Sequence, residues 1–131
     1  MVVNKQESAR SLALSVLEQV FDQGAYSNIA LNKALESSRL SAQDKGLVTE
    51  LVYGTVSRKI TLEWYLARFI EDREKLDTWV YYLLMLSLYQ LLYLDKLPIH
   101  AVVNEAVHIA KRGRGTDKFV NAVLRKISQT S

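Results

Sequence analysis

The amino-acid sequence predicts an all-α protein that folds as one compact bundle of about seven helices. Apolar residues recur at the 3.6-residue spacing of an α-helix along nearly the whole chain. There are only one proline and five glycines, which argues against a turn-rich β fold. The composition is 49% apolar and 24% charged, as in ordinary globular proteins. The length of 131 residues fits a single domain, residues 1–131, with a sizeable hydrophobic core.

Two helices are predicted in the first 40 residues. An apolar stripe runs from Ala9 to Phe21, and Gly24 follows it as a C-terminal stop signal. A short second helix is predicted after Asn28, with an apolar face made by Ala30, Leu31, Ala34 and Leu35.

Two further helices are predicted before the charged segment 71–77, which we expect to be a loop or a single turn. Ser41 and Asp44 have the spacing of a capping box, so a helix is expected to begin there. Gly54 lies inside this helix, where glycine costs about 1 kcal/mol relative to alanine, and a close helix crossing is the expected reason. Thr61 is predicted to cap the next helix, whose buried face contains Leu62, Tyr65, Leu66, Phe69 and Ile70.

A long central helix is predicted from Thr78 to Leu94. This uncharged run is bracketed by Asp77 and Asp95 and is short for a membrane span, which needs roughly 20 apolar residues. We therefore expect a core helix and no membrane partner. One face carries an aromatic stripe that is expected to pack inside, with the hydroxyls at the boundary, rather than to stack on nucleobases. Its members are Tyr82, Leu86, Tyr89 and Tyr93.

The last two helices are predicted at Ile99–Arg112 and Thr116–Ser128, because Pro98 ends the preceding helix. Asn104 and Asn121 each follow an apolar pair. We expect both amides to be buried and to fix the geometry of the loop between these two helices.

Positive charge is concentrated between His108 and Ile127. This window holds six of the 17 basic residues and one of the 14 acidic residues, so the rest of the chain is slightly negative. The helix after the loop adds free backbone N–H groups and the positive end of its dipole. The pattern favours a phosphate backbone as partner, with a protein partner or a merely solvated loop as alternatives. Four of the basic residues lie on the connection itself: Lys111, Arg112, Arg114 and Lys118.

No pattern in the chain predicts a catalytic, metal or cofactor site. The absence of cysteine excludes disulfides and thiolate chemistry and is compatible with a reducing cytosol. His100 and His108 lie about two helical turns apart without a third ligand, although Glu105 has the spacing to pair with His108. Phosphate-binding glycine motifs are also absent. The N-terminus lacks the apolar core of a signal peptide, so a cytoplasmic location is expected.

Several motifs resemble the NusB-like family: ARSLALSVLEQV, LVYGT, YQLLYLDKLPIHAVVNEAV and FVNAVLR. The segment DKGLVTELVYGTVSRKITLEWYLARF is similar in particular to the N-terminal NusB-like domain of bacterial ribosomal RNA cytosine-5 methyltransferases of the RsmB (Sun/Fmu) type. The resemblance covers Ser8 to Ile127. It implies two small, roughly orthogonal helical subdomains and a role in binding and positioning small-subunit ribosomal RNA.

In that family, a C-terminal methyltransferase domain follows and holds the S-adenosylmethionine site and the catalytic cysteines. The resemblance therefore implies a non-catalytic part of a longer rRNA-processing enzyme. Its expected partners are ribosomal RNA and that methyltransferase domain. The residues expected to bind RNA are Lys5, Arg10, Lys111, Arg112, Arg114 and Lys118, of which the arginines of the loop can also stack on unpaired bases.

Two alternatives remain open. One is a free-standing NusB-type antitermination factor, which regulates transcription by binding RNA together with a ribosomal protein. Such factors typically have an arginine-rich first helix, whereas this chain offers only Lys5 and Arg10 there. The other is a protein-interaction module that docks a catalytic domain, for which no RNA affinity is expected even at low salt.

Overall fold

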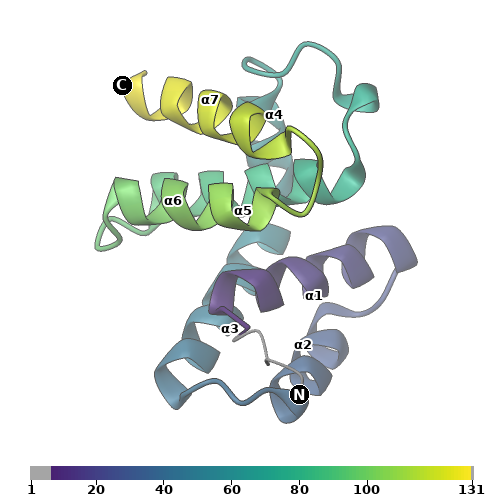
Figure 1. The fold of residues 1–131 in the computed structure, drawn as a ribbon. Helices are drawn as coiled ribbons and strands as arrows, with labels where there is room; N and C mark the ends of the chain where they lie inside the picture. Colours follow the sequence, from purple (N-terminus) through teal and green to yellow (C-terminus); the bar gives the residue numbers. More distant parts are fainter. Residues whose placement is uncertain (1–6, 131) are drawn as a thin grey trace.

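Seven α-helices and one short 3-10 turn make up the computed structural model, which describes residues 7–130 (Figure 1). No strand occurs in this part of the chain, so the predicted all-α class is confirmed. None of its helices is long and apolar enough to cross a membrane. The elements are α1 (Ala9–Gln23), α2 (Ser27–Ser37), α3 (Ala42–Ser57), α4 (Lys59–Leu66), η1 (Arg73–Lys75), α5 (Thr78–Tyr93), α6 (Ile99–Ala110) and α7 (Thr116–Gln129).

The helices form two groups that meet along α5. Helices α1, α2 and α3 pack on one another in the lower half of Figure 1, and α4 to α7 form the upper half. Helix α5 contacts α1 and α3 on one side and α4, α6 and α7 on the other. One continuous cluster of buried apolar side chains runs through both groups. The described residues therefore close a core of their own.

Helix α5 is the centre of this core. Every residue from Val80 to Gln90 is buried, as expected for a helix that is apolar on all sides. The aromatic stripe packs inside as predicted: the hydroxyl of Tyr82 donates to Asp22 of α1, and that of Tyr89 donates to Glu50 of α3. Each ring is thus buried while its polar tip reaches the boundary of the core.

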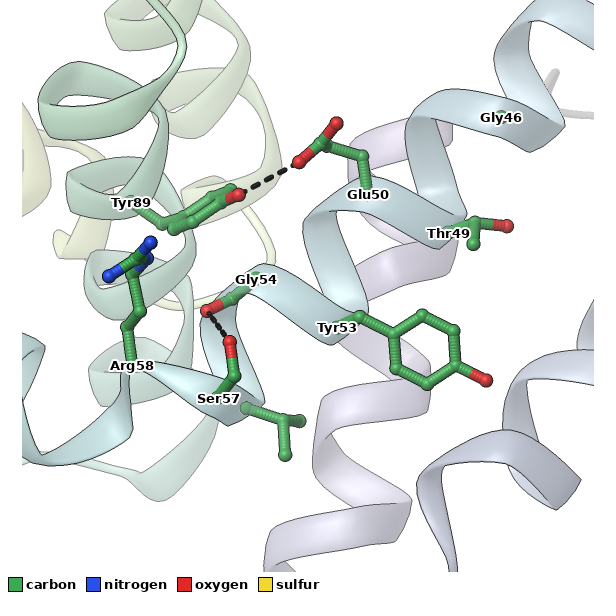
Figure 2. Close-up of a pocket in the computed structure, with 9 residues that line it drawn as sticks. Gly46, Thr49, Glu50, Tyr53, Gly54, Ser57, Arg58 and Tyr89 are labelled. Carbon is green, nitrogen blue, oxygen red and sulfur yellow. Dashed lines mark hydrogen bonds between the residues drawn. The ribbon is translucent and has the colours of Figure 1, made fainter.

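Gly54 marks the predicted close crossing between α3 and α5. A Cβ at this position would overlap the ring of Tyr89, so no larger residue fits without a shift. Figure 2 shows the Tyr89 ring facing α3 at this point, with its hydroxyl 2.9 Å from Oε2 of Glu50. The expectation from the sequence is confirmed.

Helix starts agree less well with the predictions. Ser41 does cap α3, because its hydroxyl accepts from the N–H of Asp44 at 3.1 Å. However, α2 begins at Ser27 after Tyr26, without a side-chain cap, so Asn28 lies inside the helix. Thr61 is likewise inside α4 and does not cap it. The reason is that the chain turns at a single residue, Arg58, which ends α3 and starts α4 without a connecting loop.

The end of α1 agrees with the prediction, whereas the placement of the two asparagines near the α6–α7 loop does not. Gly24 ends α1 in the left-handed conformation with φ of 71°, as predicted. The predicted burial of Asn104 and Asn121 is wrong: Asn104 is exposed, and Asn121 is half-buried and accepts from Nε of Arg125 at 3.0 Å. Neither amide is therefore enclosed in the core. Both follow buried valines but lie on the outer part of their amphipathic helices.

Candidate nucleic-acid interface

The basic connection between α6 and α7 is tightly built. Helix α6 ends at Ala110 and α7 begins at Thr116, so only five residues join them. A Cβ at Gly113 would overlap Oγ1 of Thr116 and lie 3.0 Å from Cζ2 of Trp79. Gly115 adopts the left-handed conformation with φ of 73°, which an L side chain rarely tolerates. The two glycines therefore let the loop lie directly on α5 and turn sharply into α7.

Arg112 fastens this loop to two other helices. Its guanidinium lies 4.6 Å from the ring centroid of Trp79 on α5. It also forms two hydrogen bonds of 3.3 Å to the carboxylate of Glu18 on α1. The arginine side chain remains 53% exposed. Arg112 therefore joins the loop to α5 and α1, while part of its guanidinium stays accessible to solvent. These contacts fix the position of the adjacent loop residues.

The other three predicted cations face solvent: Lys111 and Arg114 lie on the loop, whereas Lys118 lies in the first turn of α7 and not on the connection as predicted. Lys111, Arg114 and Lys118 are exposed and form no ion pair with any residue between 7 and 130. Arg114 and Lys118 flank the N-terminus of α7 in sequence, where no side chain caps the first-turn N–H groups, and Lys111 lies at the C-terminal end of α6. Positive side chains beside such a helix end favour an anion such as a phosphate. Asp117 in the first turn of α7 reduces this charge by one.

The two N-terminal residues of the predicted interface differ in their placement. Lys5 lies outside the described residues. Arg10 is only 14% exposed and lies among α1, α5 and α6. Its Nε donates to Oε1 of Gln90 at 2.6 Å, and Nη1 is 3.5 Å from Oε1 of Glu105. The structure therefore uses Arg10 to join three helices and does not bring it into the exposed cation group of the loop.

A shallow depression of about 550 Å³ lies along α3 (Figure 2). Its polar groups include Glu50 and the hydroxyl of Tyr89, whose pKa is raised by burial of the tyrosine and by the hydrogen bond to Glu50. Arg58 at its edge stacks over the ring of Tyr93 at 4.1 Å. The carboxylate of Glu50 lines the depression and repels phosphate, so the depression fits nucleic acid less well than the basic loop.

The histidines take no part in a metal or acid–base cluster. Within residues 7–130, no group of three or more His, Asp or Glu side chains is arranged to hold a metal ion. Glu105, which has the spacing to pair with His108, pairs with Arg10 instead.

The sequence did not indicate three residues that organise this surface: Glu18, Trp79 and Gln90. Glu18 and Trp79 hold Arg112, and Gln90 holds Arg10, yet each lies on a helix distant in sequence from its partner. For Arg10 a signal existed, since it shares a helix face with Leu14 and Leu17, which are both buried. For Glu18 and Trp79 no local pattern marks the contact.

Fold and surface together define a small all-helical domain that presents a pre-ordered cationic loop. The chain belongs to the NusB family, whose sequence profile matches residues 7–129. This membership confirms the family resemblance of the motifs.

Curated relatives connect the chain with ribosomal RNA methyltransferases. It is 48% identical over 127 residues to the probable ribosomal RNA small subunit methyltransferase B of Bacillus subtilis (strain 168), covering 95% of this chain and 28% of that protein. It is 38% identical to the corresponding probable protein of Synechocystis, covering 91% of this chain and 27% of that one. The chain thus spans little more than a quarter of the length of these relatives.

A solved structure supports the fold. NusB of T. maritima superposes with a TM-score of 0.83 at 24% identity, covering 99% of this chain and 94% of that chain. At this level of identity, the similarity establishes the three-dimensional arrangement of the helices and nothing about ligands.

Proposed function

We propose that this NusB-family domain binds ribosomal RNA and positions it for a methyltransferase part of the same longer protein. The observation that carries the proposal is the match to the B. subtilis relative, which covers 95% of this chain but only 28% of that methyltransferase. The domain then contributes binding, whereas S-adenosylmethionine and the methyl transfer to cytosine belong to the remaining part. An enzyme acting on ribosomal RNA in bacteria works in the cytoplasm, which is where we place it.

In this proposal, Lys111, Arg114 and Lys118 contact the RNA backbone. All three are exposed, and Arg114 and Lys118 flank the N-terminus of α7, so phosphate oxygens can meet both cations and backbone amides there. Arg112 mainly holds the loop on Trp79 and Glu18, and its accessible edge is available to an unpaired base. Lys5 remains a predicted contact at the N-terminus.

The test is a triple variant with Lys111→Ala, Arg114→Ala and Lys118→Ala, titrated with a small-subunit rRNA hairpin at several salt concentrations. Its matched control removes three exposed cations on other elements: Lys33→Ala, Arg39→Ala and Lys96→Ala. The loop variant is expected to bind more weakly and to lose about 0.7–0.9 from the log–log salt slope for each phosphate contact removed. Equal affinities and slopes for the two variants would exclude the loop as the RNA surface.

A free-standing antitermination factor is the second candidate. Membership of the NusB family over residues 7–129 is compatible with this function as well as with the first. The two functions are distinguished by adding a ribosomal protein. An antitermination factor is expected to bind its RNA element much more tightly in its presence, whereas a methyltransferase domain is expected to be indifferent to it.

A further inference from the structure

Helix α4 carries large apolar side chains on its outer side as well as on its inner side, beside the polar residues Lys59, Thr61 and Glu63. On the inner face, Leu62 and Leu66 are fully buried against the core. On the outer face, Ile60 is 83% exposed and Trp64 is 63% exposed. Surface helices normally have one apolar and one polar face, and a helix that is apolar all round is normally covered on all sides. In this domain, α3 and α5 cover the inner side of α4 only.

The outer face has the anatomy of a small interface. Ile60 and Trp64 lie one helical turn apart, so their side chains form one patch. The indole is held in place by the edge of the Tyr65 ring, with centroids 5.5 Å apart, and by the Arg68 guanidinium at 5.4 Å. Tryptophan and arginine are the residues that dominate binding energy at protein interfaces, and an ordered side chain loses little entropy on binding.

The rim of this patch is polar and carries both signs of charge, with the cations in excess. Glu63 pairs with Lys59 at 3.4 Å and with Arg73 at 2.8 Å. This carboxylate lies on α4 between Ile60 and Trp64 in sequence, and Arg68 adds a further cation beside the indole. An apolar centre of Ile60 and Trp64 with a polar rim has the composition of a protein–protein interface, and an exposed isoleucine gives RNA no contact of its own.

We propose that the outer face of α4, centred on Ile60 and Trp64, docks against the methyltransferase part of the same longer protein. This inference rests on the proposed function. In the B. subtilis relative, 72% of the length lies outside the region matched here, since the match covers 28% of it. That larger part is expected to present a shallow apolar pocket for the indole, with an acidic group facing Arg68.

Because the patch is small, it is better suited to a partner in the same polypeptide than to a separate chain. Stable association of separate chains, including two copies of this one, usually buries about 800 Å² on each partner, from roughly 20–30 residues. Two large apolar side chains fall far short of that. A partner in the same polypeptide is held at a high effective concentration, so a small patch is sufficient to orient it.

Hydroxyl-radical footprinting with mass spectrometry tests the proposal by comparing the 131-residue chain with the full-length parent protein. Tyr26, which is 75% exposed, serves as the reference for radical dose. We expect Ile60 and Trp64 to be oxidised at least threefold more slowly in the parent than in the separate domain. Equal oxidation of Trp64 in the two proteins would overturn the proposal.

Two other outcomes would also overturn it. Protection of Trp64 that rises with the concentration of the 131-residue chain would assign the patch to a second copy. Protection in the parent only after rRNA is added would assign it to RNA. Methyl transfer to rRNA by the parent is measured in parallel. An active parent with unprotected Trp64 refutes the docking alone, whereas an inactive parent with protected Trp64 refutes the proposed function alone.

A double variant, Ile60→Ser with Trp64→Ser, provides a second readout that does not depend on footprinting. Because both side chains are exposed, the unfolding midpoint of the 131-residue chain is expected to stay unchanged. In the parent, docking is expected to raise the midpoint of this domain, and the variant is expected to lower it to that of the separate domain. The control is Tyr26→Ser with Ile29→Ser, a second pair of exposed apolar residues, which is expected to leave the parent unchanged.

Discussion

The guanidinium of Arg112 lies 4.6 Å from the ring centroid of Trp79, so the basic loop is held against the central helix α5. The same arginine reaches Glu18 on α1 through two hydrogen bonds of 3.3 Å. These contacts hold the loop on α5 and α1, so the proposed binding of RNA to it is expected to cost less conformational entropy.

The first prediction concerns the contact between Arg112 and Trp79. Trp79→Leu keeps an apolar residue under the loop but removes the aromatic ring, so the loop is expected to become more mobile. We expect faster hydrogen exchange of residues 111–118 and a two- to fivefold weaker RNA affinity. The salt slope is expected to stay unchanged, because no phosphate-binding cation is lost. A change in slope as large as that of Lys111→Ala would mean that Trp79 does not act by positioning.

The second prediction uses two glycines of α3. Gly54→Ala places a methyl group against the Tyr89 ring, and overpacking of this kind costs typically about 1–3 kcal/mol. Gly46→Ala is the matched control, because nothing lies within 4 Å of its Cβ position. It is expected to stabilise the helix by about 0.5–1 kcal/mol. Urea unfolding of both variants measures the difference, and effects of the same sign would contradict this interpretation.

The third prediction concerns the core of α5. Leu84→Ala removes a fully buried side chain and is expected to lower the free energy of unfolding by about 2–5 kcal/mol. Leu91, in the last turn of the helix, is only partly buried, so Leu91→Ala is expected to cost less. Chemical denaturation measures the free energy of unfolding of both variants. A larger loss for Leu91→Ala than for Leu84→Ala would contradict the central position of Leu84.

The fourth prediction concerns alkaline pH. Burial, the hydrogen bond to Asp22 and the charge of Asp22 raise the pKa of Tyr82 from 10.0 to about 12. Above pH 10, the unfolded chain releases this proton while the folded chain retains it, so the contribution of Tyr82 to stability falls as pH rises towards about 12. The stability gap between the unmodified chain and Tyr82→Phe is therefore expected to narrow over this interval. A gap that is constant from pH 9 to 12 in urea titrations would refute the raised pKa.

The fifth prediction separates the two possible roles of Arg10. Arg10→Met is expected to destabilise the domain by about 1–3 kcal/mol, because Oε1 of the buried Gln90 loses its donor. The salt slope of RNA binding is expected to remain that of the unmodified chain. A stable variant with a slope lower by about 0.7–0.9 would instead show that Arg10 contacts phosphate.

Local sequence patterns determined most of the helical framework. The apolar spacing placed the long helix at Thr78–Leu94, where the structure has Thr78–Tyr93. Gly24 ended the first helix because it tolerates a left-handed backbone, and Gly54 indicated a close crossing because a helix interior otherwise disfavours glycine. These signals depend on a few neighbouring residues, so they are visible in the sequence itself.

Only the tertiary structure decided what the charged side chains do. Arg10 and Arg112 look alike as surface cations in the sequence, yet Arg10 bonds Gln90, 80 residues away, and Arg112 bonds Glu18, 94 residues away. The exposure of Ile60 and Trp64 also depended on which face of α4 the neighbouring helices cover. Such contacts depend on how whole helices pack, and the apolar periodicity that places each helix contains no information about which distant polar group it will meet.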